Sequence, residues 1–167
     1  NGYVYITATE ETTGQVYLGR FLPAPDGTAS GAFEPLGTIT LNGVPPAGNF
    51  RNGDIAFDGD GNLYALVNQD QEGGQAVICY AAAASISTTA GGTTEMDEVY
   101  QVVNEAGIDF TGLVVGLAMA SNGNFYLAVQ GAGDGGIYLT RRDGTNAIIT
   151  EQISNIDAAN IADLATS

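Results

Sequence analysis

A repeated hairpin pattern constrains the fold of this chain of 167 residues more than any other feature. One copy occupies residues 54–64 (DIAFDGDGNLY) and another occupies residues 116–126 (GLAMASNGNFY). Each copy reads as a strand, a tight turn and a second strand, because Asp-Gly and Asn-Gly supply the positive φ that short hairpin turns require. Self-similarity of this kind predicts a repeat architecture.

A third copy is divided between distant parts of the sequence. Residues 163–167 followed by residues 1–5 read DLATSNGYVY, which matches the other copies with a slightly shorter turn. A further strand pattern follows each copy, and fourth strands are expected at residues 36–41, 99–103 and 147–153. We therefore predict an all-β chain that forms one domain of three units: a split unit (1–42 plus 160–167), a second unit (52–104) and a third unit (114–154).

The pattern resembles the innermost hairpin of the blades in secreted β-propellers of the NHL and SMP-30-like kind. That hairpin commonly begins with Asp or Gly, then Leu or Ile, then Ala, and ends with Gly-Asn, an apolar residue and Tyr. The resemblance implies a β-propeller with about three four-stranded blades in this chain, the third being split. Enzymes of the SMP-30-like kind bind a divalent metal in the central channel, and the matching positions here are Asp54 and Asp163, with Gly116 in the remaining copy.

Such a chain needs strands from elsewhere to complete its blades. Closed propellers contain roughly 4–8 blades, and an unpaired apolar strand edge invites aggregation. Chains could close a ring by lending strands to one another, with a dimer favoured; the chain could be an excerpt of a longer array; or copies could grow head-to-tail into a fibre. The expected assembly residues are Asp163, Leu164, Ala165, Tyr3, Val4 and Tyr5.

The charge of the chain narrows the range of partners. The sequence holds 4 Lys plus Arg residues against 19 Asp plus Glu, a formal net charge of −15. Such a surface repels phosphate backbones and anionic membranes, so we expect no nucleic acid and no membrane insertion. Divalent cations and neutral glycans remain suitable partners, and the charge also serves plain solubility.

The residue types that the chain lacks argue against catalysis. The chain has no His, which removes the Ser–His nucleophile and argues against zinc catalysis. Its single Cys, Cys79, lies in an apolar run and reads as a small buried hydrophobe. Abundant Gly, Thr, Asn and Asp without Lys are typical of bacterial extracellular proteins, so we expect a secreted or cell-surface location.

One loop carries oxygen ligands at alternate positions, as calcium loops do: Asp58, Asp60 and Asn62. Its counterpart at residues 120–124 has no acidic residue. Asp and Asn are also the standard residues of hairpin turns, so a plain turn is the alternative. Calcium is the one cofactor that the sequence suggests.

Acidic residues in the loops form a second candidate site, which could bind cations or a glycan or could be a solvated rim. The set comprises Glu10, Glu11, Asp70, Glu72 and Asp134. The only basic cluster, Arg141 and Arg142, would pair with a neighbouring subunit or within the chain. We predict a non-catalytic structural module that assembles with copies of itself; the alternatives are a carbohydrate-binding propeller lectin and, third, a metal-dependent hydrolase of the SMP-30-like kind.

Overall fold

The computed structural model describes residues 2–10, 12–22, 33–46, 54–68, 75–130 and 135–154. Within these ranges the chain is all-β, as the repeat pattern predicts, and the one helical segment is the short 3-10 turn η1 (Ala83–Ser85). In the same ranges, no helix has the length and apolar character needed to cross a membrane.

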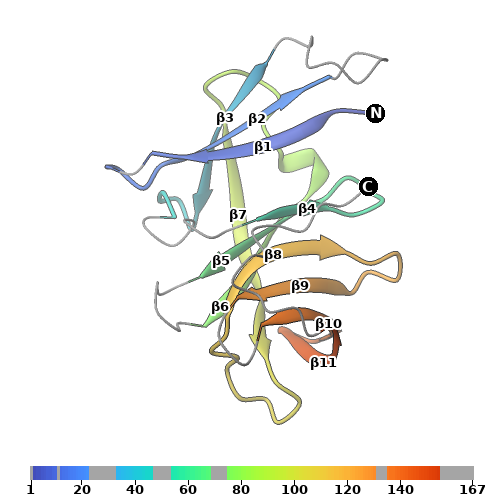
Figure 1. Cartoon of the computed structure of the whole chain (residues 1–167). Helices are drawn as coiled ribbons and strands as arrows, with labels where there is room; N and C mark the ends of the chain where they lie inside the picture. Colours follow the sequence, from blue (N-terminus) through green and yellow to red (C-terminus); the bar gives the residue numbers. More distant parts are fainter. Residues whose placement is uncertain are drawn as a thin grey trace.

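The strands form three consecutive antiparallel meanders, here called units 1, 2 and 3 (Figure 1). Unit 1 contains β1 (Val4–Thr9), β2 (Val16–Phe21) and β3 (Glu34–Leu41); unit 2 contains β4 (Ile55–Phe57), β5 (Leu63–Asn68), β6 (Ala76–Ala81) and β7 (Thr93–Val103); unit 3 contains β8 (Leu113–Met119), β9 (Phe125–Gln130), β10 (Gly136–Asp143) and β11 (Asn146–Ser154). Within each unit every strand pairs with the next one along the chain. The two intact copies of the repeat are the hairpins β4–β5 and β8–β9, as predicted.

The same turn closes both hairpins. Gly61 and Gly123 have φ angles of 83° and 82°, which a residue with a Cβ rarely adopts. Gly61 donates its N–H to the carbonyl of Asp58 at 3.0 Å, and Gly123 donates its N–H to the carbonyl of Ala120 at 2.8 Å. The Gly-Asn pattern that the two turns share in the sequence thus corresponds to the same backbone conformation in both hairpins.

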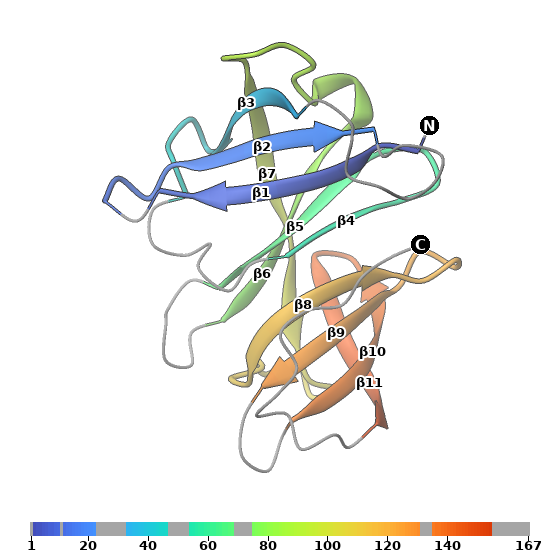
Figure 2. The same ribbon diagram turned by 45° about the horizontal axis from the view of Figure 1, so that its top comes forward.

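Strand β7 links the three units, and Figures 1 and 2 show it running along all of them. Its beginning pairs parallel with β3, from Thr93 to Met96, and its end pairs parallel with β11. The sequence predicts a strand only at residues 99–103, whereas β7 begins at Thr93. The strand is longer because its first residues find backbone hydrogen-bond partners in unit 1, a long-range pairing that leaves no local signal.

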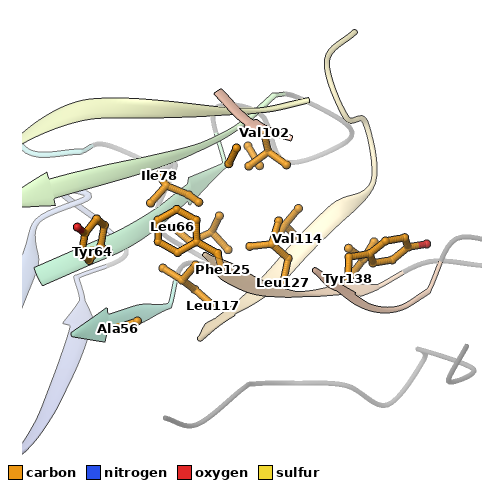
Figure 3. Packing of buried hydrophobic residues seen from close by; sticks show 13 residues of the cluster. Ala56, Tyr64, Leu66, Ile78, Val102, Val114, Leu117, Phe125, Leu127 and Tyr138 are labelled. Atoms are coloured by element: carbon orange, nitrogen blue, oxygen red, sulfur yellow. The ribbon is translucent and has the colours of Figure 1, made fainter. Parts of the chain in front are cut away.

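Two apolar cores lie between the units. The core between units 1 and 2 contains Val16, Leu18, Leu36, Ile39, Leu63, Ala65, Val67, Val77, Cys79, Ala81 and Met96. The core between units 2 and 3 contains Ala56, Tyr64, Leu66, Ala76, Ile78, Val102, Val114, Leu117, Phe125, Leu127, Val129, Tyr138 and Ala147 (Figure 3). Successive residues of β5 enter different cores, since side chains alternate across a strand.

Unit 2 is therefore buried on both faces. This explains why β6 reads AVICYA, a nearly continuous apolar run rather than an alternating one. Cys79 is 1% exposed, which confirms its prediction as a buried hydrophobe. Burial, and then the negative charges of Glu98 and Asp97, raise the pKa of its thiol to about 12, so it stays protonated at neutral pH.

A close approach of two glycines fixes the crossing of unit 1 and unit 2. Gly37 of β3 has a φ of 112°, and a Cβ there would collide with the backbone carbonyl of Gly92. The next residue, Thr38, donates its N–H to that same carbonyl at 2.9 Å. Neither the conformation nor the contact tolerates a side chain at Gly37.

We expect Gly37→Ala to lower the free energy of unfolding by about 3 kcal/mol or more, because the backbone must move away from Gly92. Gly43→Ala is the matched control: its φ is 76°, but nothing lies within 4 Å of a Cβ there. That control should cost only about 1–2 kcal/mol. Urea unfolding of both variants measures the difference, and equal losses would contradict this account of the crossing.

Candidate functional site

The face of unit 1 that points away from unit 2 is apolar and exposed. Directly opposed residues of β1 and β2 share this face, because opposed residues of an antiparallel pair point to the same side. We call it the open face, made of Val4, Ile6, Ala8, Tyr17, Phe21 and Phe33. Val4 and Ile6 are each 42% exposed, and Tyr17 is 45% exposed. Contiguous exposed apolar surface is typical of an interaction site.

The outer edge of β1 is the second unusual feature of unit 1. In the repeat, β1 occupies the place of β5 and β9, which are each preceded by a paired strand, β4 or β8. Among the described residues, β1 pairs with β2 alone. The same part of the chain therefore presents both an open face and a strand edge.

The predicted assembly residues divide into two groups. Tyr3 and Tyr5 are held by their own chain: the Arg20 guanidinium lies 4.2 Å from the centre of the Tyr3 ring, and the ring of Tyr5 lies 4.5 Å from that of Phe57. Val4 lies on the open face, where it is partly exposed to solvent. The remaining three, Asp163, Leu164 and Ala165, lie outside the described residues.

The loop proposed for calcium is organised by the Asp58 carboxylate. Its Oδ1 accepts the backbone N–H groups of Asp60 at 3.0 Å and Asn62 at 2.9 Å. Its Oδ2 accepts the Asn62 side-chain amide at 2.9 Å and the Tyr64 hydroxyl at 3.3 Å. Partial burial raises the pKa of Asp58, whereas these hydrogen bonds to its carboxylate lower it. The combined effect of the hydrogen bonds is larger than that of burial, so the pKa lies below its ordinary value.

Both carboxylate oxygens of Asp58 thus already serve the turn. The Asn62 side-chain oxygen is also engaged, since it accepts the N–H of Ala83 at 3.0 Å. A calcium ion would have to displace these hydrogen bonds to use the loop oxygens. Across the described parts of the chain, no cluster of three or more Cys, Asp or Glu residues is placed to hold a metal. Calcium binding stays a prediction.

Asp54, the other described candidate metal ligand, connects two units. Its Oδ2 accepts the backbone N–H of Leu117 in β8 at 2.8 Å, and its Oδ1 accepts the N–H of Ile55 at 2.7 Å. Hydrogen bonds to a carboxylate are stronger than those between neutral groups. The geometry therefore gives Asp54 a structural role between units 2 and 3, for which the sequence carries no local signal. Its counterpart Asp163 lies outside the described residues.

The predicted set of acidic loop residues is represented by Glu10 alone. Glu10 closes the turn between β1 and β2, where its side chain accepts the Thr13 hydroxyl at 2.6 Å and its backbone N–H donates to the carbonyl of Gln15 at 2.8 Å. The other members, Glu11, Asp70, Glu72 and Asp134, lie outside the described residues. The proposed ligand loops stay a prediction.

The two neighbouring arginines have different surroundings. Arg141 forms an exposed ion pair with Asp143 at 2.9 Å, as the within-chain alternative predicts. Arg142 instead lies between units, with its guanidinium 5.8 Å from the ring centres of both Tyr100 and Phe125. The sequence offered no signal for this contact, because Tyr100 belongs to a different unit.

Comparison with protein-family models, with curated proteins and with solved structures found no match. The resemblance of the hairpins to propeller blades therefore stays a prediction.

We expect Asp58→Ala to lower the free energy of unfolding by about 1–3 kcal/mol near neutral pH, because it removes the acceptor of the turn hydrogen bonds. Asp60→Ala, an exposed acid in the same turn, should change it little. Urea unfolding at neutral pH measures both.

The same pair of variants tests the pKa of Asp58. Because the folded pKa is lowered, the stabilisation is fully present above the unfolded value of about 3.9 and is lost as the pH falls through the lower folded value. The gap in stability between the wild type and Asp58→Ala should therefore narrow in strong acid. A gap that is constant with pH would show that the Asp58 charge is unimportant to the turn.

Proposed function

We propose that this chain is a non-catalytic, extracellular assembly module of the β-propeller type, in which copies complete one another by sharing a strand at the outer edge of β1. One observation carries the proposal: among the described residues, the strand that corresponds to β5 and β9 lacks the paired inner strand that β4 and β8 supply in the other units. Addition of a strand to an open edge is a common mode of association.

The repeat identifies the segment that would fill this place. Residues 163–165 (DLA) match residues 54–56 (DIA) at the start of β4. In unit 2, Ile55 lies opposite Ala65 and Ala56 lies opposite Tyr64. The same register would place Leu164 of one copy opposite Ile6 of another, and Ala165 opposite Tyr5.

The architecture supports a propeller in particular. Each complete unit is a four-stranded antiparallel meander, and consecutive units pack face to face through apolar cores. Two copies would supply about six such units, within the roughly 4–8 blades of closed propellers. A closed dimer is therefore the assembly that we favour over an open fibre.

Ala165→Asp in the full chain tests the shared strand. Its counterpart Ala56 is 1% exposed, so a carboxylate at this position would be buried beside Tyr5 if the strand is shared as proposed. We expect the variant, and a chain that lacks residues 160–167, to shift from dimer to monomer. Native mass spectrometry and light scattering report the change.

Asn160→Asp adds the same charge outside the matching segment and is the control, which should assemble as the wild type does. A truncated chain that stays folded with the wild-type mass in solution would overturn strand sharing. A wild type that is monomeric at every concentration tested would do the same.

A further inference from the structure

The open face consists of positions that the other two units bury. Aligned on the repeat Tyr, the residues Val4, Ile6 and Ala8 of β1 correspond to Leu63, Ala65 and Val67 of β5 and to Phe125, Leu127 and Val129 of β9. The residues of β5 lie in the core with unit 1, and those of β9 lie in the core with unit 2. In units 2 and 3 this row of positions is at most 2% exposed, whereas Val4 and Ile6 are each 42% exposed.

The next strand follows the same rule. Tyr17 of β2 corresponds to Val77 of β6 and to Tyr138 of β10. Val77 packs against unit 1 and Tyr138 packs against unit 2, but Tyr17 is 45% exposed. Unit 1 thus presents to solvent the surface that each later unit presents to the unit before it.

Unit 3, at the other end of the repeat, has the face by which units 1 and 2 each pack onto the unit that follows. Val16 and Leu18 of unit 1 pack onto unit 2, and Ala76 and Ile78 of unit 2 pack onto unit 3. The corresponding residues of unit 3 are Ile137 and Leu139, which are half-buried and belong to neither core. We call these two residues, with the half-buried Tyr126 opposite Leu139 on β9, the trailing face; Ala128, opposite Ile137, is 0% exposed.

We propose that the open face of one copy packs against the trailing face of a second copy, which continues between chains the interface that the chain already forms twice within itself. This inference rests on the proposed function in that the partner is another copy of this chain, and it adds the surface by which the copies meet. The contact is heterologous, since each copy contributes a different face.

The chemistry of the open face favours a partner surface that buries it. The open face carries no charged side chain, although the chain as a whole has a formal net charge of −15. Burial of these apolar groups provides the attraction, and repulsion between the acidic copies opposes it. Assembly should therefore tighten as added salt screens the repulsion.

Two single variants and their mixture test the proposal. Ile6→Glu places a charge on the open face, and Leu139→Glu places one on the trailing face. Each should weaken self-association at least about 100-fold, since an unpaired charge would be buried at the contact. Mixed together, the two variants should form a one-to-one complex. The Ile6→Glu variant keeps an intact trailing face, which can pack against the intact open face of the Leu139→Glu variant. Ser121→Glu, in an exposed turn, is the charge-matched control.

Native mass spectrometry distinguishes the outcomes, with circular dichroism confirming that each variant is folded. If Ile6→Glu dissociates the assembly and Leu139→Glu does not, the trailing face takes no part in the contact and the inferred heterologous interface is wrong. If neither variant has an effect while Ala165→Asp dissociates the assembly, strand sharing stands and the inferred contact fails. If all three variants assemble as the wild type does, both proposals fail.

Discussion

Every unit of this protein has two apolar faces, and the packing of those faces governs the rest of the structure. A meander of three or four strands is a single layer, so an apolar face of it is buried only where another layer packs against that face. Unit 2 is covered by unit 1 on one face and by unit 3 on the other, as the division of β5 between two cores shows. Within the described ranges, units 1 and 3 each pack against a neighbouring unit on one face only.

Apolar burial attracts the units to one another but does not set their relative position, because it has no direction. Directional contacts do so at each junction. Between units 2 and 3 the Asp54 carboxylate receives the N–H of Leu117, and between units 1 and 2 the Gly92 carbonyl receives the N–H of Thr38. Strand β7 adds parallel pairing with both neighbouring units. The arrangement of the units is thus fixed by a few hydrogen bonds around two apolar cores.

The features that could be predicted from the sequence are those set by residues close together in the chain. The Gly61 and Gly123 turns and the hairpins they close were predictable because glycine at positive φ is a local requirement. The alternation of Val4, Ile6 and Ala8 was also predictable, but the sequence could not say that this side is the open one, since a period of two residues does not say which side is covered. Contacts between units, such as Arg142 with Tyr100 and β7 with β3, left no local trace. The role of Asp54 was missed for the same reason.

The distribution of charge bears on where copies can meet. Natural proteins often protect an open sheet edge with charged residues, with Lys above all, or with Pro. This chain has no Lys, and β1 reads VYITAT, without a charge or a proline. The strong net negative charge opposes association over most of the surface, yet neither the edge nor the open face of β1 carries any of it. The edge of β1 therefore lacks this protection, and it lies beside an apolar face whose counterparts in units 2 and 3 are buried. Both features favour contact with a partner at this part of unit 1.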